Sequence, residues 1–389
     1  MASTHPTATF VTRILTHYRV PFHEIVRDLL GRDGVRYRLI YGLPDSSEAA
    51  KGDLAQIDWA EQAHQTPLLG REKLVWQHVV RRVWKDDLVV LGQENQLLVN
   101  YLFQSLRHFG GPKLALFGHG RNFQARNPAS QAERWKAYWA TRCDWWFAYT
   151  EETRCHIEAL GFPGDRITVF NNSVDTRALR DDLAAVDDAT KIALRAQAGL
   201  QGKNIGVFVG GLYDEKRIKF LVAASDIVRA RVPDFELLVI GGGVDLNMLL
   251  GLAAERPWIK AVGPQFGTRK AGMMSLAKLF LMPGLLGLAV LDAGVAGLPV
   301  VTTAYPWHSP EIAYLSDGEN GLIVKDWLSE REYAEAVVSL LEDEAARTKM
   351  GETALVMVNG RTIEDMAARF AEGIKKALTQ SGQTLMGSH

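Results

Sequence analysis

The sequence predicts an α/β protein whose helices cover parallel sheets, arranged as two domains. Short runs of apolar and β-branched residues end in glycine and alternate with segments of helical periodicity. This pattern is typical of parallel sheets with helices on both faces. The chain has 389 residues, more than a single hydrophobic core usually organises. Its 47% hydrophobic and 23% charged residues are typical of a globular enzyme and exclude a disordered chain.

In the first half of the chain, apolar periodicity predicts strands that alternate with helices. A helix is predicted over residues 20–32, where apolar side chains recur at helical spacing. The segment 164–176 closes this half with a strand and an asparagine-rich turn. Further strands are predicted at 7–14, 35–43, 86–93, 113–120 and 144–150, and further helices at 96–110 and 131–143.

The second half repeats the pattern more clearly. A helix over 218–233 ends near a proline, and another is predicted over 287–297. Strands are predicted at 205–212, 235–243, 259–264, 278–284 and 298–304. Glycines follow several of these strands, at the carboxyl edge where parallel sheets bind their ligands.

The two halves predict a first domain over residues 1–178 and a second over 179–361. A last helical segment, 362–380, is expected to pack back on the first domain. Two such domains leave a cleft between them, which is the usual site of small-molecule chemistry. The final Gly-Ser-His is typical of a cloning remnant.

The low cysteine content and the shortness of the apolar runs favour a cytoplasmic protein. Cys143 and Cys155 are the only cysteines, and we expect two reduced thiols. No apolar run reaches the roughly 18 residues that a membrane span needs. The first residues also lack the pattern of a secretory signal.

Charge is unevenly shared between the halves, although the net charge is −1. Residues 1–180 carry 23 Lys and Arg against 19 Asp and Glu, a net +4, and the remainder carries 21 against 26, a net −5. A basic first half suits an anionic ligand or a membrane surface. The helix at 20–32 adds arginines to an apolar face, which predicts peripheral membrane contact. The alternative is that this face packs on the sheet.

An unusual stretch, residues 280–303, is almost wholly apolar but contains six glycines and prolines and one acid, Asp292. An ionised acid among apolar residues is costly unless it is paired. Either Asp292 meets a ligand, or the stretch is a tight corner between strand and helix that exposes the acid.

Five segments, in order, resemble the glycosyltransferases of family 4, retaining enzymes of the GT-B fold. They are "HYRVPF" (17–22), "TEETRCHIEALGFPGDRITVFNNSVDT" (150–176), "FVGGLYDEKRIKFLVAA" (208–224), "MPGLLGLAVLDAGVAGLPVVTT" (282–303) and "SPEIAYLSDGENGLIV" (309–324). The resemblance implies two Rossmann-like domains facing a central cleft. It also implies a nucleotide diphosphate sugar held mostly by the second domain and an acceptor held mostly by the first.

In the second domain the resemblance implies that Gly210, Gly211 and Lys216 hold the donor, with the Lys216 ammonium at the diphosphate. The family usually has an arginine where this chain has Gly211, and Arg19 or Arg217 is a candidate substitute. The alternative interpretation is that Lys216 is a surface lysine in a turn.

The family also carries two glutamates separated by seven residues, and here those places are Gly284 and Asp292. The resemblance implies that Asp292 accepts hydrogen bonds from the donor ribose. The backbone at Gly284, Leu285, Leu286, Gly287 and Leu288 can approach the sugar and diphosphate closely, because glycine has no side chain. The following helix points its amino end at the phosphates.

In the first domain, His119 follows a predicted strand at the carboxyl edge of the sheet. The resemblance places it near the transferred sugar, and the alternative is a histidine satisfied within its loop. Arg121 and Asn122 are candidate contacts of acceptor or phosphate. His17, Tyr18 and Arg19 are further candidates, in the loop that enters the first helix.

The predicted function is a retaining, metal-independent hexosyltransferase that uses a UDP- or GDP-sugar and no other cofactor. His119 and Lys216 are the predicted catalytic residues. The acceptor is a saccharide or a lipid-linked saccharide, in polysaccharide, lipopolysaccharide or glycolipid assembly, and no nucleic acid is involved. No dinucleotide fingerprint, zinc-ligand spacing, Walker loop or nucleophile elbow occurs. The alternatives are a nucleotide-sugar epimerase or hydrolase of the same fold, and a nucleotide-binding protein that lost catalysis.

Overall fold

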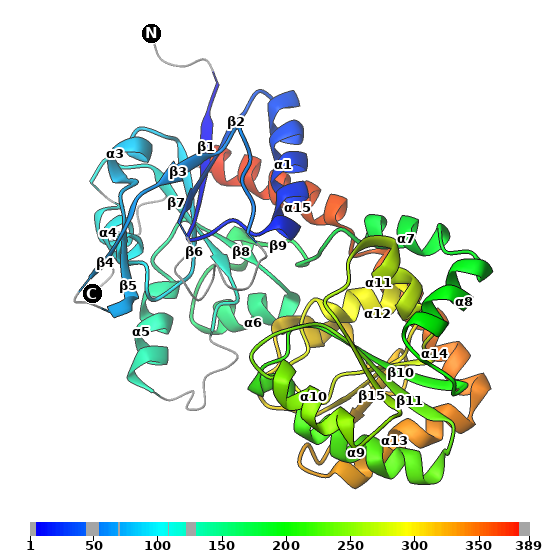
Figure 1. Ribbon diagram of the computed structural model, residues 1–389. Coiled ribbons are helices and arrows are strands. Elements are labelled where there is room, and N and C mark those ends of the chain that lie inside the picture. Colours follow the sequence, from blue (N-terminus) through cyan, green and yellow to red (C-terminus); the bar gives the residue numbers. More distant parts are fainter. Residues whose placement is uncertain (1–4, 44–53, 69–70, 108, 122–129, 381–389) are drawn as a thin grey trace. The chain divides into compact units, whose positions relative to one another are not determined.

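The computed structural model describes residues 5–43, 54–68, 71–107, 109–121 and 130–380 (Figure 1). The chain forms two compact units. Unit 1 comprises Met1–Asn172 and Ile363–His389, and unit 2 comprises Ser173–Thr362. The chain therefore leaves unit 1, builds unit 2 and returns to unit 1 for its last helix.

Unit 1 is built on a parallel sheet of seven strands in the order β3-β2-β1-β6-β7-β8-β9. The chain first adds strands on one side of β1 and then places β6 on its other side, so the order reverses between β1 and β6. The strands are β1 (Thr7–Thr12), β2 (Arg36–Gly42), β3 (Glu61–Ala63), β6 (Leu88–Gly92), β7 (Lys113–Gly118), β8 (Trp145–Ala148) and β9 (Ile167–Val169).

The helices of unit 1 include all those expected from the sequence and add short ones. They are α1 (Val20–Arg32), α3 (Val80–Val83), α4 (Leu98–Leu106), α5 (Gln131–Ala140), α6 (Glu151–Ala159) and α15 (Ile363–Thr379), with single turns at His17–Arg19 and Gly164–Arg166. An antiparallel ribbon of β4 (Gln65–Leu68) and β5 (Arg71–Gln77) was not predicted. Its first strand, Gln-Thr-Pro-Leu, lacks the apolar alternation of a half-buried strand.

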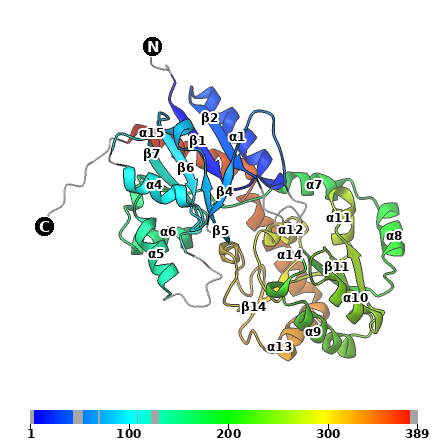
Figure 2. The ribbon, with the colours of Figure 1, turned by 60° about the vertical axis from the view of Figure 1, so that its left-hand side comes forward.

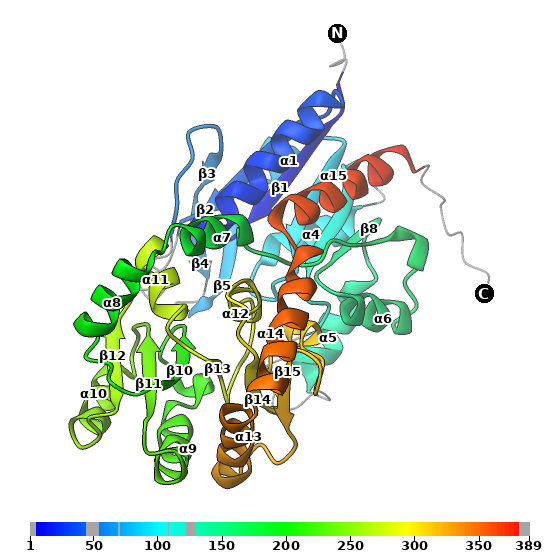
Figure 3. The same cartoon turned by 90° about the vertical axis from the view of Figure 1, so that its right-hand side faces the viewer.

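Helix α1 begins and ends at the predicted residues. A proline lies in its first turn, where its missing N–H removes no hydrogen bond within the helix. Its apolar face buries Phe22, Val26 and Leu30 completely, in the core that α15 also enters. Figure 3 shows α1 and α15 side by side. The prediction that this face contacts a membrane is therefore wrong, because the face packs inside unit 1.

Helix α15 completes the core of unit 1. Phe370 is fully buried, and its ring lies 4.2 Å from that of Phe147 and 5.2 Å from that of Phe22. Gly373 lets the helix approach the sheet, since a Cβ there would lie 2.5 Å from the Thr168 hydroxyl. The last helix thus joins unit 1 by a close apolar contact.

Unit 2 contains a parallel sheet in the order β12-β11-β10-β13-β14-β15. Figure 3 shows β12, β11, β10 and β13 side by side in this order. The strands are β10 (Asn204–Val209), β11 (Phe235–Ile240), β12 (Ile259–Gly263), β13 (Leu279–Leu281), β14 (Val300–Thr303) and β15 (Gly321–Val324). The order reverses between β10 and β13. In open α/β sheets this switch point is where ligands bind, beyond the carboxyl ends of the strands.

The helices of unit 2 pack on both faces of its sheet, and α7, α8 and α11 form one group of neighbours (Figure 2). They are α7 (Thr176–Ala184), α8 (Asp188–Gln197), α9 (Ile218–Arg231), α10 (Leu246–Ala254), α11 (Gly267–Met274), α12 (Ala289–Val295), α13 (Glu330–Glu342) and α14 (Glu344–Asn359), with single turns at Asp214–Lys216 and Pro310–Tyr314. Both units are therefore Rossmann-like, as predicted.

Two smaller expectations can be compared with the structure. Cys143 is buried and Cys155 exposed, and both are free thiols. Among the described residues, every helix is too short or too polar to cross a membrane.

We predict that Phe370→Ala lowers the free energy of unfolding of unit 1 by about 3–5 kcal/mol, because it empties a large site in the aromatic core. Urea unfolding followed by near-ultraviolet circular dichroism measures the change. Phe266→Ala is the matched control, since that ring is 74% exposed and should contribute little. Equal effects of the two substitutions would contradict the structural role of α15.

Candidate functional site

The predicted donor residues of unit 2 gather at its topological switch point. Gly210 directly follows β10, and residues 282–288 follow β13, the neighbouring strand. The turn at Asp214–Lys216 lies against the second of these loops. Two segments about 70 residues apart in the chain therefore form one edge of the sheet, as their glycines indicated.

Gly284 is the point of closest approach between the two loops. A Cβ at this position would lie 2.2 Å from the carbonyl oxygen of Glu215 and 2.7 Å from the carbonyl carbon of Lys216. Both neighbours are backbone atoms, which cannot turn aside as a flexible side chain can. No side chain fits here, and in particular not the first glutamate of the family motif.

Hydrogen bonds hold the two loops together on both sides of Gly284. The Lys216 Nζ donates to the Leu285 carbonyl at 2.5 Å, and the Leu285 amide donates to the Glu215 carbonyl at 2.8 Å. The Leu286 amide donates to His308 Nδ1 at 2.9 Å. Contrary to the expectation that the loop amides approach a phosphate, those of Leu285 and Leu286 are engaged by protein acceptors.

The remaining residues of this loop lie beside the turn at Pro310–Tyr314. A Cβ at Gly287 would lie 3.3 Å from the Ser309 hydroxyl and 3.8 Å from a carboxylate oxygen of Glu311, which is almost completely buried. Leu288 is the residue before α12. The loop is thus enclosed by the chain on one side and by Lys216 on the other.

Lys216 is buried, with 6% of its surface exposed, and is not the surface lysine of the alternative interpretation. Burial lowers the pKa of its ammonium from 10.5 to about 8, and the negative charge of Glu215 opposes this shift. Its ring neighbour is Tyr213, whose centroid lies 5.6 Å from the nitrogen. A buried cation of this kind gains from any anion that comes within contact.

The space beside Gly211 is occupied by Tyr213. A Cβ at Gly211 would lie 2.9 Å from that ring, so a longer side chain would have to displace it. Arg217, one candidate substitute for the family's arginine, donates to the Trp327 carbonyl at 2.6 Å and lies over the Phe220 ring. Arg19, the other candidate, belongs to unit 1.

Asp292 forms an ion pair with Lys270 of α11, at 2.6 Å. Both side chains are about one fifth exposed. The cost of placing an acid among apolar residues is therefore offset inside the protein, and that cost no longer argues for a ligand. A role for Asp292 at the ribose would require the ligand to share it with Lys270.

His308 was missed by the sequence interpretation. Its Nδ1 accepts from the Leu286 amide, so the proton is on Nε2, which lies 2.8 Å from the Thr303 carbonyl and donates to it. Burial lowers its pKa from 6.5 to about 4, and the Lys216 charge adds to this effect. The neutral His308 side chain thus joins the loop at Leu286 to the end of β14 by two hydrogen bonds. Its position directly before the fifth segment of resemblance, 309–324, is the signal in the sequence that could have drawn attention to it.

In unit 1 the predicted residues His119 and Arg19 meet around an unpredicted one, Tyr149. The His119 and Tyr149 ring centroids are 4.2 Å apart, and the Arg19 guanidinium lies 6.0 Å from the Tyr149 ring centre. Arg19 also donates to the Asn172 side chain at 2.6 Å. Tyr149 and Asn172 follow β8 and β9, so all but Arg19 come from the carboxyl edge of the sheet.

His119 is neutral in this setting. Burial lowers its pKa from 6.5 to about 3, helped by the positive charges of Lys136 and Arg19. A neutral imidazole can donate one hydrogen bond and accept another, but it lacks the second ring proton with which an imidazolium acts as a general acid.

The other predicted residues of unit 1 are dispersed. His17 and Tyr18 form a ring pair with centroids 5.9 Å apart, and Tyr18 also lies beside Arg19. Arg121 forms an exposed ion pair with Glu152 at 2.5 Å. Asn122 lies outside the described residues. Among the described residues, no group of His, Cys, Asp and Glu has the geometry of a metal site.

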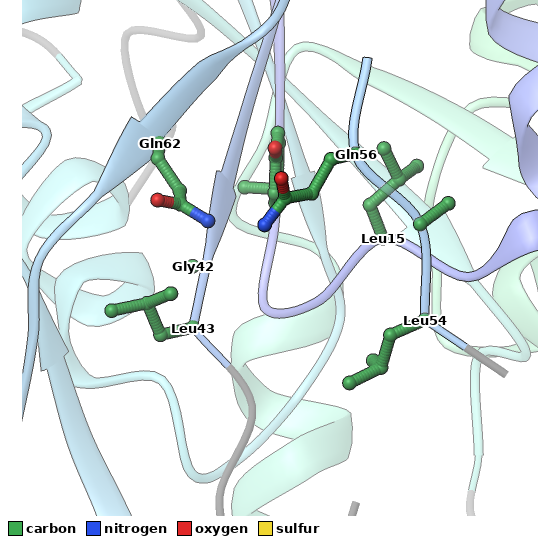
Figure 4. Close-up of a pocket in the computed structure, with 8 residues that line it drawn as sticks. Leu15, Gly42, Leu43, Leu54, Gln56 and Gln62 are labelled. Atoms are coloured by element: carbon green, nitrogen blue, oxygen red, sulfur yellow. The ribbon is translucent and has the colours of Figure 1, made fainter. Parts of the chain in front are cut away.

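Unit 1 also contains a cavity of about 400 Å³ at the carboxyl ends of β1 and β2 (Figure 4). Gln56 and Gln62 supply carboxamides, and the other lining residues are apolar, aromatic or glycine. None of the predicted site residues lines it. The lining residues are Leu15, Tyr41, Gly42, Leu43, Leu54, Ala55, Gln56 and Gln62.

Two Rossmann-like units in one chain, each with loops at the carboxyl ends of its strands, define the GT-B class of α/β protein. HepE of Anabaena, solved in complex with UDP, superposes with a TM-score of 0.69 over 95% of this chain and 100% of its own, at 16% identity. This similarity shows the fold.

Sequence comparisons match part of the chain to a family of glycosyltransferases. Residues 203–343, within unit 2, match the family described as Glycosyl transferases group 1. An alpha-D-kanosaminyltransferase of Streptomyces kanamyceticus is 27% identical over 43% of this chain and 44% of its own length. A D-inositol 3-phosphate glycosyltransferase of Corynebacterium aurimucosum is 28% identical over 53% of this chain and 50% of its own length. The chain thus aligns with about half the length of these relatives. Together the matches support its assignment to the GT-B glycosyltransferases that resemble family 4.

We predict that Gly284→Ala lowers the free energy of unfolding of unit 2 by about 1–3 kcal/mol, because the new methyl group meets backbone atoms. The matched control is Gly251→Ala in α10, where a Cβ meets nothing within 4 Å. That substitution should stabilise by up to about 1 kcal/mol, through helix propensity. Denaturant unfolding of both variants checks the contrast, and a stable Gly284→Ala protein would contradict the close contact.

A second prediction concerns the buried charge of Lys216. Because its pKa in the folded protein is about 8, below the 10.5 of the unfolded chain, the cost of burying the charge is full below pH 8. That cost disappears as the pH rises from 8 to 10.5. The parent should therefore gain about 3 kcal/mol relative to Lys216→Met over this range. Unfolding free energies of both proteins against pH measure it, and a constant difference would show that the amine is not buried.

Proposed function

We propose that this protein transfers a sugar from a nucleotide diphosphate sugar to an acceptor hydroxyl, with retention of the anomeric configuration. The observation that carries the proposal is the meeting of Lys216 with the loop 284–288 at the switch point of unit 2. The family match over 203–343 contains both segments, and the Anabaena relative was solved with UDP. We expect UDP or GDP as the nucleotide and no metal requirement.

In this proposal Lys216 neutralises the leaving diphosphate. The ammonium exchanges its Leu285 carbonyl partner for a phosphate oxygen, and the anion raises the pKa of the amine, so the cation is kept where charge develops. Asp292 accepts from the ribose hydroxyls while Lys270 remains beside it. The leaving phosphate oxygen then takes the acceptor proton on the same face of the sugar.

His119 of unit 1 is proposed to contact the transferred sugar as a neutral hydrogen-bonding group. Its low pKa supports this role and does not support a role as general acid. Tyr149 holds the imidazole by ring contact. Arg19 is proposed to meet an anionic part of donor or acceptor. The acceptor is proposed to be a saccharide, free or lipid-linked.

Two other functions share this fold. An epimerase or hydrolase would consume donor without forming a glycoside, and a binding protein would hold nucleotide without consuming donor. The second is favoured by Gly211 and Gly284, which replace the family's arginine and glutamate. Product analysis with donor and a panel of acceptors separates all three.

The first test is thermal unfolding with UDP or GDP in the presence of EDTA. Ligand at 100 times its dissociation constant should stabilise the protein by about 2.7 kcal/mol. No stabilisation by any nucleoside diphosphate, with or without magnesium, would overturn the proposal.

Variants then distinguish the roles of individual residues. Asp292→Ala should weaken binding of free nucleotide by about tenfold to a hundredfold, because it removes an ionised acceptor of about 1.5–3 kcal/mol. His119→Ala should lower turnover and leave nucleotide affinity nearly unchanged, because the free nucleotide carries no sugar. Isothermal titration and initial rates measure the two effects.

Lys270→Met is the control for Asp292, since it breaks the same ion pair but keeps the carboxylate. It should alter stability and leave nucleotide affinity within a few-fold of the parent. If Asp292→Ala and Lys270→Met both change stability alone, the acid is structural and its proposed role at the ribose is wrong.

A further inference from the structure

The loop after β13 leaves a small open space in front of Gly287. A Cβ at Gly287 would have only side-chain atoms as its three nearest neighbours, among them the Ser309 hydroxyl at 3.3 Å and a carboxylate oxygen of Glu311 at 3.8 Å. At Gly284 a Cβ would instead meet a backbone atom at 2.2 Å. Gly287 therefore faces two hydrogen-bonding side chains across a gap, whereas Gly284 is in direct contact with the chain.

Hydrogen bonds fix the position of these two side chains relative to the loop. The Leu286 amide donates to His308 Nδ1 at 2.9 Å, and the Ser309 amide donates to the Leu286 carbonyl at 3.0 Å. Ser309 directly precedes the turn that contains Glu311, and its side chain makes no capping hydrogen bond there. Glu311 is 2% exposed. The hydroxyl and the carboxylate are thus ordered before any ligand arrives, which lowers the entropy cost of binding.

The two ends of this short loop carry opposite charges. The buried ammonium of Lys216 donates to the Leu285 carbonyl at 2.5 Å, and the carboxylate of Glu311 lies beside Gly287. Leu285 and Gly287 are two residues apart, at most about 7 Å of chain, so one donor molecule can contact both groups. An ammonium suits a diphosphate, whereas a carboxylate repels phosphate and accepts hydrogen bonds from hydroxyl groups.

We propose that Glu311 recognises hydroxyl groups of the transferred sugar, with the Ser309 hydroxyl beside it. This inference rests on the proposed function and assigns the sugar end of the same site. Residues 284–288 contain no acid of their own, and Glu311 supplies a carboxylate from the neighbouring turn. An ionised carboxylate has about four acceptor positions, so Glu311 can accept from two sugar hydroxyls and keep other partners.

The same carboxylate selects among sugars. A hydroxyl group donates to it, but a second carboxylate brought beside it is repelled, which disfavours an acidic sugar. The transferred sugar is accordingly a neutral sugar with free hydroxyl groups and not a uronic acid. Gly287 contributes to this selection, because a side chain at that position would fill the space that the sugar needs.

Isothermal titration of the full chain with free nucleotide and with the matching nucleotide sugar tests the inference. The probes are UDP with UDP-glucose, and GDP with GDP-mannose. Glu311→Gln should weaken binding of the nucleotide sugar about tenfold or more, because a charged acceptor is lost, and leave free nucleotide within about twofold of the parent. A purely structural role would change both affinities together. An unchanged ratio of the two affinities would overturn the inference.

Gly287→Ala tests the open space without removing an acid. Its methyl group should weaken binding of the nucleotide sugar about tenfold and spare free nucleotide, because it occupies the place of the sugar. The variant should remain folded, since its nearest contact is a serine side chain that can turn aside. A Gly287→Ala protein that binds nucleotide sugar like the parent would show that the sugar lies elsewhere and contradict the proposal.

Two further variants serve as controls. Glu319→Gln removes an exposed acid of the same segment and should change neither affinity. Asp292→Ala, at the proposed ribose contact, should weaken nucleotide and nucleotide sugar alike and keep their ratio constant. If Glu319→Gln lowers the ratio as much as Glu311→Gln does, the effect comes from net charge and the proposal fails.

The charge of the sugar is tested with UDP-glucuronic acid or GDP-mannuronic acid, according to the nucleotide that binds. The parent should bind the acidic sugar about tenfold more weakly than the neutral one, and Glu311→Gln should reduce this difference. Equal affinities would overturn the assignment of a neutral sugar. If neither UDP nor GDP binds, the proposed function and this inference fall together, whereas nucleotide binding with a ratio unaffected by Glu311→Gln overturns this inference alone.

Discussion

The backbone contact between Gly284 and the turn at Asp214–Lys216 is the constraint on which the candidate donor site depends. It brings the loop after β13 against the loop after β10 at the point where the strand order reverses. Where the two backbones touch, the buried Lys216 donates to the Leu285 carbonyl, and its burial lowers its pKa. The absence of a side chain at residue 284 is thus the condition for the loop geometry, whatever chemistry the site performs.

The same contact separates this chain from the family pattern it resembles. A glutamate at residue 284 would require the turn to move away, and an arginine at residue 211 would require Tyr213 to move. His308 holds the other side of the loop through the Leu286 amide. The two departures from the family therefore lie at closely packed positions, where the Tyr213 ring and main-chain atoms fill the space that larger side chains would need.

Much of the fold could be predicted from the sequence, because apolar periodicity reports burial directly. Helix α1 and the strands that end in glycine were found where expected, and Gly210, Lys216 and residues 284–288 were expected at the same sheet edge. Pair contacts could not be predicted. Lys270 lies 22 residues before Asp292, and nothing in the local pattern indicates that the two side chains meet. The membrane-facing interpretation of α1 failed for a related reason, since an apolar helix face looks the same whether another helix or a lipid covers it.

The return of α15 to unit 1 determines the order in which the two units can be completed during synthesis on the ribosome. The core around Phe370 draws on residues from both ends of the chain, whereas unit 2 is a continuous segment. All of unit 2 is synthesised before the last helix of unit 1. The part of unit 1 that precedes unit 2 must therefore remain with the surface around Phe22 and Phe147 uncovered until α15 is made.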